Sequence, residues 1–337
     1  MDANELTATA LALAASGKGI LAADESTPTI TKRFKAIDLP STEENRRAYR
    51  EMLFTTPRLG DSISGVILFD ETIRQRARDG RTFVKVLQEQ GIVPGIKVDK
   101  GAKALANFRS EKITEGLDGL QERFKEYFDL GARFSKRRAV ITIGERTPSQ
   151  TCISVNAHAL ARFATLSQET GLAPIVEPEV LMDGSHTIER CEEVTEETLR
   201  IVFEQLVEHR VVLEQMLLKP NMVIAGQDCP KQAGVIEVAE ATLRCLRRTV
   251  PAAVPGVVFL SGGQSDVLAT QHLNQMNQLG GAPWQLSFSF GRALQAPALQ
   301  AWHGNNLSAG QQALSHRARC NSAELYGRYS QEMEKKD

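Results

Sequence analysis

The chain has 337 residues, of which 42% are hydrophobic and 24% are charged, as in an ordinary globular protein. Its 40 lysines and arginines nearly balance its 41 aspartates and glutamates, which argues against a basic nucleic-acid-binding protein and against a polybasic membrane anchor. The length fits one large domain or two medium ones.

The first predicted element is a short N-terminal helix around Thr9–Ala15, because Met1–Ala14 lacks the lysine or arginine that a signal peptide needs. No apolar run approaches the roughly 20 residues that cross a bilayer, so no membrane partner is expected. The five cysteines are scattered and form no C-x-x-C pair, so we expect neither a disulfide framework nor a zinc ribbon. A reducing cytoplasm is the predicted location.

Eight short apolar runs that end at or near a polar residue are predicted strands. In chain order they cover residues 19–24, 65–70, 95–99, 134–143, 174–178, 216–220, 256–261 and 285–290. Their spacing is typical of βα units.

Helical patterns fill the intervals between these runs. Ser41–Glu44 has the sequence of a capping box, which predicts a helix over residues 45–54. A further helix around Leu160 is expected to end at Gly171. Thr195 is predicted to cap a helix whose apolar face includes Leu199.

Alternating strands and helices predict an α/β protein with a (β/α)8 barrel, and a doubly wound open sheet is the second choice. No G-x-G-x-x-G follows the first strand, as the dinucleotide-binding version of that sheet would require. No linker interrupts the pattern, so we expect one barrel domain over residues 1–337 with a helical tail from about residue 306.

Lys219 is the most informative polar residue at the end of a predicted strand, which is where barrel enzymes hold their catalytic groups. Two leucines precede it and Pro220 follows, so its surroundings are predicted to be apolar. Desolvation and a neighbouring cation, Lys136 or Lys97, would lower its pKa and make it a nucleophile. This predicts Schiff-base chemistry on a ketone or aldehyde; the alternative is a buried stem with its ammonium in solvent.

Carboxylates at other strand ends are candidates for the acid and base that imine chemistry needs. Glu177 and Asp24 end two of the predicted strands. Glu179 is expected to share a face with Glu177, where it either raises the pKa of one carboxyl or forms an ion pair with Lys136 or Arg138.

Two clusters could bind phosphate. Glycine-rich residues 261–265 follow the seventh strand, and Ser289–Arg292 follows the eighth, which is where barrels commonly bind phosphate. The alternatives without phosphate binding are a tight turn at residues 261–265 and a solvated helix face at Lys32 and Arg33. The candidate ligands are Ser261, Gly262, Gly263, Ser289, Gly291 and Arg292 in the first cluster, and Ser26, Lys32, Arg33 and Lys97 in the second. No histidine lies in an H-x-H or H-E-x-x-H pattern, so neither a metal site nor a cofactor is expected.

Taken together, eight segments in order resemble class I fructose-1,6-bisphosphate aldolases. They are residues 17–26, 42–47, 65–69, 95–101, 174–179, 217–222, 260–265 and 287–295. The resemblance implies reversible aldol cleavage of fructose 1,6-bisphosphate in glycolysis and gluconeogenesis, and a homotetramer.

The resemblance also implies a role for each matching residue. Lys219 matches the Schiff-base lysine, Glu177 the residue that moves protons during imine formation, and Lys136 the lysine that biases those protonation states. Asp24 matches the group that deprotonates the substrate hydroxyl. The first cluster matches the 1-phosphate site, and the second cluster, together with Arg138, falls where the family's other phosphate contacts gather.

Three positions depart from the family pattern. Arg137 stands where the family usually has tryptophan, and Phe290 where many members have tyrosine. The family's C-terminal tyrosine, which protonates the enamine, has no counterpart in Lys335–Asp337, so we expect slow enamine protonation. Two alternatives are another lysine-dependent barrel acting on a sugar monophosphate, and a non-catalytic scaffold.

Overall fold

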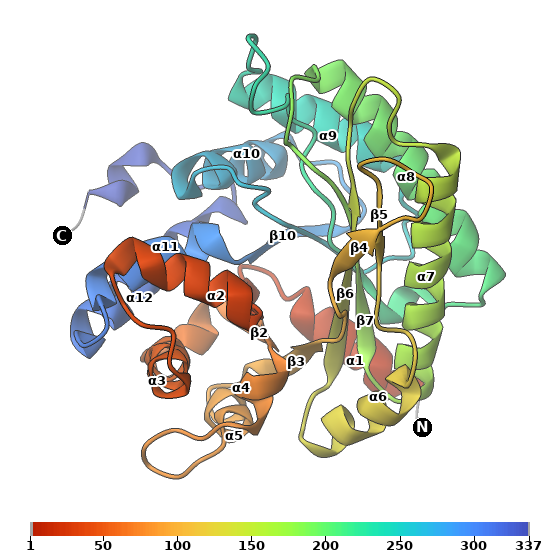
Figure 1. Cartoon of the computed structure of the whole chain (residues 1–337). Helices are drawn as coiled ribbons and strands as arrows, with labels where there is room; N and C mark the ends of the chain where they lie inside the picture. Colours follow the sequence, from red (N-terminus) through yellow and green to blue (C-terminus); the bar gives the residue numbers. More distant parts are fainter. Residues whose placement is uncertain (1–2, 336–337) are drawn as a thin grey trace.

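Eight parallel strands close into a barrel in the computed structural model, which describes residues 3–335 (Figure 1). Around the barrel each strand pairs with its neighbours in chain order, and the last strand pairs with the first. The strands are β1 Gly19–Ala23, β2 Ile63–Leu68, β3 Val93–Lys97, β6 Phe134–Ile141, β7 Ala173–Val180, β8 Leu217–Leu218, β9 Gly256–Phe259 and β10 Gln285–Phe290. The predicted (β/α)8 barrel is confirmed, and the open sheet is wrong.

Helices cover the outside of the barrel. They are α2 Thr27–Phe34, α3 Glu43–Phe54, α4 Asp70–Arg74, α5 Phe83–Gln88, α6 Leu120–Asp129, α7 Gln150–Glu169, α8 Ile188–Glu208, α9 Val235–Thr249, α10 Asp266–Leu279, α11 Arg292–Trp302 and α12 Leu307–Glu324. Among residues 3–335, none of the helices combines the length and the apolar character needed to cross a membrane.

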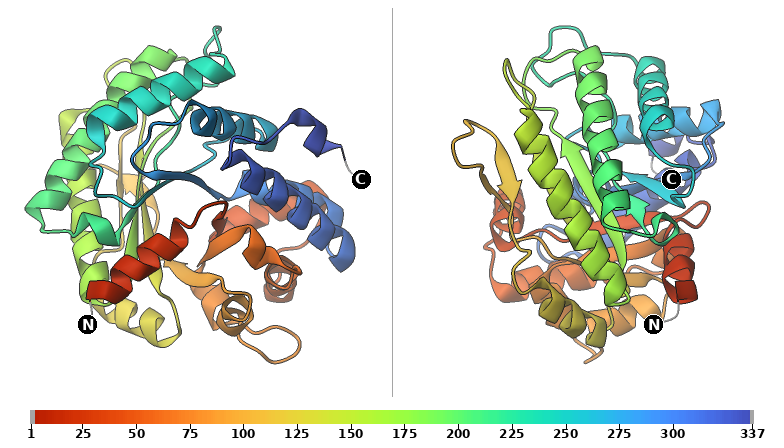
Figure 2. Two further views of the ribbon diagram at one scale, coloured as in Figure 1. Left: turned by 180° about the vertical axis from the view of Figure 1, so that it is seen from behind. Right: turned by 90° about the vertical axis from the view of Figure 1, so that its right-hand side faces the viewer.

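The predicted N-terminal helix is α1 Ala3–Leu13, which lies across the end of the barrel where the strands begin (Figure 2, left). Its Leu13 packs in a small apolar cluster with Ile20, Phe134 and Ile175 from the strands. This cluster fills the barrel interior. The barrel interior next to α1 is therefore apolar.

A phenylalanine on β6 fills the space that glycines leave on the neighbouring strands. A Cβ on Gly95 would lie 2.3 Å from the ring of Phe134, and one on Gly65 would lie 3.2 Å from it. The ring therefore requires glycine at position 95, since real Cβ atoms do not approach other atoms so closely.

Two predicted helix starts are wrong and one predicted end is confirmed. The helix α8 begins earlier than expected, because Thr187 accepts a hydrogen bond from the Arg190 amide at 3.3 Å. Thr195 lies buried inside α8, where its hydroxyl accepts a hydrogen bond from Asn221. The cap of α3 is Thr42, one residue after Ser41, and its hydroxyl accepts from Asn45 at 3.1 Å. Gly171, with φ +82°, follows the end of α7 as predicted.

An antiparallel hairpin was not predicted. It consists of β4 Ala102–Ala104 and β5 Lys112–Thr114 and lies outside β6. Arg137 points away from the barrel interior and donates hydrogen bonds to the carbonyls of Thr114 and Glu115. Its side chain is 1% exposed, and burial lowers the pKa of Arg137 to about 10. The arginine that replaces the family's tryptophan thus attaches this hairpin to the barrel wall.

The contact between Gly95 and Phe134 predicts a stability difference between two glycine substitutions. Gly95→Ala is expected to lower the free energy of unfolding by about 1–3 kcal/mol, because the new methyl group overlaps the ring. The matched control, Gly234→Ala, meets no atom within 4 Å and is expected to cost about 0.5 kcal/mol as a helix N-cap change. Chemical denaturation measures both, and Phe134→Leu should restore part of the loss in Gly95→Ala. Equal losses in the two alanine variants would contradict this account.

Candidate active site

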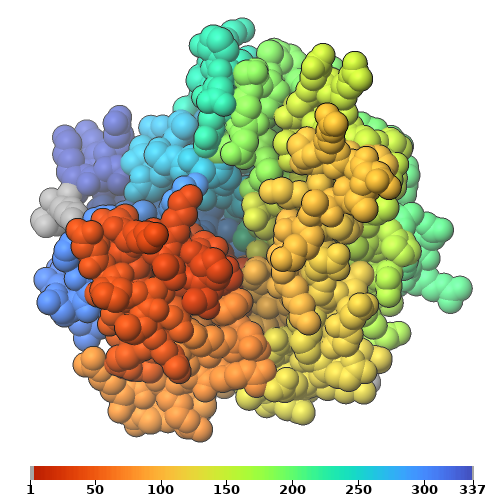
Figure 3. Space-filling view, viewed as in Figure 1, coloured from red at the N-terminus to blue at the C-terminus, as the bar shows by residue number. Residues whose placement is uncertain are grey.

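A recess lies on the face where the strands end, between the N-terminal part of the chain and the segment that carries the β4–β5 hairpin (Figure 3). Lys219 directly follows β8, and its amide donates to the carbonyl of Val176 on β7 at 2.8 Å. The side chain of Lys219 is buried, and the whole residue is 3% exposed. A lysine in such surroundings requires a compensating partner.

Four charged groups alternate in sign across the mouth of the barrel. Lys219 Nζ lies 3.3 Å from Glu177 Oε1, and the other oxygen of Glu177 lies 2.7 Å from Lys136 Nζ. Lys136 Nζ in turn lies 3.1 Å from Asp24 Oδ2. We call Asp24, Lys136, Glu177 and Lys219 the charge chain. Its alternation offsets part of the free energy that burying each charge alone would cost.

The charge chain shifts the pKa values of its members in opposite directions. Burial lowers the pKa of Lys219, and repulsion from Lys136 lowers it further, although Glu177 opposes both. Burial would also lower the pKa of Lys136, but attraction to Asp24 and Glu177 outweighs it and raises that pKa. Burial would raise the pKa of Asp24, yet the surrounding lysines hold it well below its usual value. Lys219 is therefore the member that most readily becomes a neutral amine.

A second layer of ion pairs lies beside the charge chain. Glu179 pairs with Arg138, which was one of the two alternatives considered for it. Asp99 accepts from the Arg138 amide at 3.4 Å and lies 3.2 Å from Lys97 Nζ. Glu179 thus interacts with a different cation from those that contact Glu177.

The predicted first phosphate cluster is brought together by the turns after β9 and β10. Gly262 and Gly263 have φ values of +56° and +83°, which favour glycine. A Cβ on Gly263 would lie 3.1 Å from a guanidinium nitrogen of Arg292 at the start of α11. The hydroxyl of Ser289 is buried and has no hydrogen-bond partner among the described residues. A helix N-terminus with glycine amides, a free hydroxyl and a guanidinium is suited to bind an anion.

The structure places Arg33 beside the first cluster, although the sequence analysis grouped it with the second. A Cβ on Gly291 would lie 3.7 Å from Nη2 of Arg33. The reason is that α2, which carries Arg33, lies over the end of β1, next to β10 in the closed barrel. Lys32 is exposed on α2. Ser26 lies directly before the start of α2, and the Ser26 hydroxyl lies 3.1 Å from the Thr29 hydroxyl.

Comparison with known proteins identifies the family to which this chain belongs. A family model described as fructose-bisphosphate aldolase class-I matches residues 5–337. The chain belongs to the class I fructose-bisphosphate aldolase family.

Individual relatives are similar to this chain over nearly its whole length. The chain is 58% identical to a probable fructose-bisphosphate aldolase class 1 of Xanthomonas campestris, over 98% of this chain and 99% of that one. It is 53% identical to a cytosolic fructose-bisphosphate aldolase of Arabidopsis thaliana, covering 96% of this chain and 84% of that one. A solved aldolase of Plasmodium falciparum, in complex with TRAP and a small-molecule inhibitor, superimposes with a TM-score of 0.96 at 51% identity, covering 97% and 95% of the two chains.

This aldolase therefore catalyses the reversible cleavage of fructose 1,6-bisphosphate to dihydroxyacetone phosphate and glyceraldehyde 3-phosphate, and as a class I enzyme it does so without a metal. The monophosphate-specific barrel and the non-catalytic scaffold are both set aside.

Glu25 is a buried residue of the aldolase that the sequence analysis missed. It forms ion pairs with Arg33 and with Arg50 on α3, and Gln295 on α11 donates to it at 2.9 Å. Burial would raise the pKa of Glu25, but Arg50 and Arg33 outweigh that effect and lower it. Glu25 thus orients Arg33 toward the first phosphate cluster. The only hint in the sequence is its position next to Asp24.

Gln264 and His272 form a second missed pair, behind the glycine turn. The Gln264 amide nitrogen donates to the carbonyl of Ser261 at 2.9 Å, so its oxygen accepts from Nδ1 of His272 at 2.6 Å. His272 is 2% exposed, and burial lowers its pKa to about 4. The histidine is therefore neutral at pH 7 with its proton on Nδ1. No sequence motif marks this pair, because an isolated histidine on a helix usually only packs.

The hydrogen bond from His272 predicts a defect in substrate binding. His272→Leu leaves the buried Gln264 oxygen without a donor, which costs about 1–3 kcal/mol. We expect loosening of the Ser261 turn to raise KM for fructose 1,6-bisphosphate about 5-fold to 30-fold, with kcat less affected. His272→Asn keeps an N–H donor and should restore most of the affinity, and His158→Asn on the outside of α7 is the control. An unchanged KM in His272→Leu would refute this role.

Proposed function

We propose that Lys219 is the amine that attacks the ketone carbon of fructose 1,6-bisphosphate. The observation that carries this proposal is the buried charge chain. In it Lys219 is paired with Glu177 and lies next to Lys136, which stays protonated. A neutral amine is the nucleophile in imine formation, so a lowered pKa increases the reactive fraction at neutral pH.

The remaining members of the charge chain are assigned to proton transfers. Glu177 takes the proton that the Lys219 ammonium loses, and the neutral amine attacks to give a carbinolamine. Glu177 then returns that proton to the carbinolamine hydroxyl, so that water leaves and an iminium forms. Asp24, ionised because of its low pKa, accepts the proton of the C4 hydroxyl. The C3–C4 electron pair then moves into the iminium, glyceraldehyde 3-phosphate departs, and an enamine remains. Protonation at C3 and hydrolysis release dihydroxyacetone phosphate and free Lys219.

Lys136 is assigned an electrostatic role. It contacts both Asp24 and Glu177, and these contacts keep it protonated. Its charge disfavours the ammonium form of Lys219 and holds the two carboxylates on either side of the reacting carbon atoms.

The two phosphate groups of the substrate are assigned to opposite sides of the mouth. Ser261, Ser289 and Arg292, with the amides of Gly262, Gly263 and Gly291 and with Arg33, are proposed to hold the 1-phosphate. Lys97 and Arg138, now paired with Asp99 and Glu179, are proposed to turn to the second phosphate, with Ser26 and Lys32 beside it. Binding both ends aligns the C3–C4 bond over the charge chain.

The assembly and location of the enzyme follow by proposal from its relatives. We propose a cytoplasmic homotetramer in which residues 1–337 form one barrel domain and the helical tail begins near residue 306. Five free, buried cysteines and a cytosolic relative support a reducing compartment. The start of α12 at Leu307 is consistent with the proposed tail.

Reductive trapping tests the nucleophile. Borohydride added with dihydroxyacetone phosphate is expected to attach the reduced ligand to the peptide that contains Lys219, as detected by mass spectrometry. Lys219→Met should abolish the adduct and lower kcat by about 10⁴-fold or more, as when other covalent nucleophiles are removed. Lys103→Met, on the exposed hairpin strand β4, should keep both the adduct and the activity. A stoichiometric adduct on Lys136 would refute the assignment.

The role of Lys136 predicts a change in the pH dependence of imine formation. Because the pKa of Lys219 lies below its ordinary value, the rate should rise with pH and level off before the ordinary lysine range. Lys136→Met removes the repelling cation, so the pKa of Lys219 should increase and the rising limb should move to higher pH. Single-turnover imine formation across pH measures this shift, and Lys136→Arg should reverse most of it. If the rising limb of the pH–rate profile does not move in Lys136→Met, the positive charge of Lys136 does not control the pKa of Lys219.

A further inference from the structure

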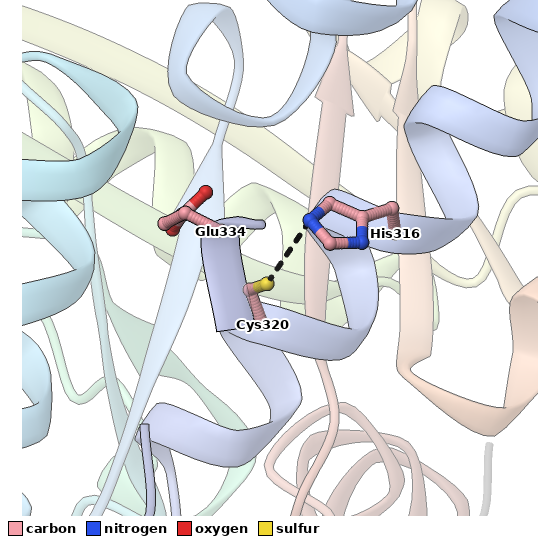
Figure 4. Close-up of side chains that lie close together, drawn as sticks. All are labelled: His316, Cys320 and Glu334. Atoms are coloured by element: carbon pink, nitrogen blue, oxygen red, sulfur yellow. Dashed lines mark hydrogen bonds between the residues drawn. The ribbon is translucent and has the colours of Figure 1, made fainter. Parts of the chain in front are cut away.

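Away from the mouth of the barrel, three potential metal ligands meet where the C-terminal segment folds back onto α12 (Figure 4). His316 and Cys320 lie one turn apart on α12, and Glu334 belongs to the short helix η4 Gln331–Glu334. Their ligand atoms all lie within 4.8 Å of one another. We propose that His316, Cys320 and Glu334 form a Zn²⁺ site, with water as the fourth ligand.

The spacing of the sulfur and the imidazole nitrogen suits a tetrahedral ion. The sulfur of Cys320 lies 3.8 Å from Nε2 of His316. Bond lengths of about 2.3 Å for Zn–S and 2.0 Å for Zn–N, at a tetrahedral angle, place sulfur and nitrogen about 3.5 Å apart. Residues four apart share one face of a helix, so both side chains reach the same point without any change of the backbone.

The types of donor favour zinc over other divalent ions. Thiolate and imidazole ligands suit Zn²⁺, whereas Mg²⁺ and Ca²⁺ prefer oxygen. Burial raises the pKa of Cys320, so without a metal the group is a neutral thiol and a weak nucleophile. A metal ion would displace that proton on binding.

Neighbouring side chains hold the Glu334 carboxylate in position. Nη1 of Arg317 donates to both oxygens of Glu334, at 2.6 and 2.8 Å, and the Tyr329 hydroxyl donates to Oε1 at 2.7 Å. Arg317 is itself buried, and its Nη2 donates to the hydroxyl of Thr270 on α10. Such outer hydrogen bonds orient ligating carboxylates in metal sites. The positive charge of Arg317 lowers the affinity for a cation, so binding should be weaker than at a closed four-ligand site.

The site lies outside the charge chain, and class I catalysis requires no metal. Zinc at this position would connect η4 to α12 and so fasten the C-terminal segment against the outer helices. We therefore expect zinc to stabilise the folded chain and to leave aldol cleavage unchanged.

Cobalt substitution of the full-length enzyme tests the site. After dialysis against EDTA, Co²⁺ is added and the thiolate-to-cobalt charge-transfer absorption is recorded, with zinc binding measured by competition. We expect one cobalt ion per chain with this absorption, and a thermal midpoint that rises with added Zn²⁺. Cys320→Ser should abolish the absorption and weaken zinc binding at least 10-fold, whereas Cys229→Ser, the matched control, should keep both.

Further variants keep the test decisive. If Cys320→Ser does not fold, His316→Gln, at a partly exposed side chain, should also weaken zinc binding at least 10-fold. Cleavage of fructose 1,6-bisphosphate by the unsubstituted enzyme should not depend on added zinc. Equal binding by the unsubstituted enzyme and Cys320→Ser, or loss of the absorption in Cys229→Ser, would overturn the proposal.

Discussion

The structure depends on burying four charges of alternating sign at one end of a barrel. Asp24 and Lys219 directly follow β1 and β8, Lys136 and Glu177 lie within β6 and β7, and each is stabilised by its neighbour of opposite charge. Removing one member would leave the next charge buried without compensation, which is far more costly than losing an exposed ion pair. The same alternation separates one easily deprotonated lysine from one that stays protonated.

Close apolar packing below the mouth of the barrel fixes the positions of the four charged side chains. The apolar cluster around Phe134 and Ile175 occupies the barrel interior, and α1 closes the end from which the strands begin. The side chains of a strand alternate in direction, so Phe134 and Lys136 point inward while Arg137 points outward. Arg137 then uses its hydrogen bonds to hold the β4–β5 hairpin. Arg137, next to Lys136 of the charge chain, thereby affects packing outside the barrel.

The outer helices position the groups proposed to bind phosphate indirectly, through buried polar residues. Glu25 holds Arg33 through an ion pair, and His272 holds the Ser261 turn through Gln264. Both arrangements use polar groups buried behind the site, where a hydrogen bond is costly to lose. The loops proposed to meet the substrate are thus fastened to the barrel by α2, α3, α10 and α11.

The sequence alone determined the eight strands and the polar residues at their ends, because short apolar runs that stop at a charge are a local property of the chain. It also marked Lys219, since a lysine between leucines and proline is unusual in itself. The tertiary structure decided which charges touch: that Glu177 lies between two lysines, that Glu179 pairs with Arg138, and that Arg33 belongs beside Gly291. The supporting pairs and the His316–Cys320–Glu334 cluster likewise arise only on folding. Closing the barrel brings together residues far apart in the chain, and no local pattern records those distances.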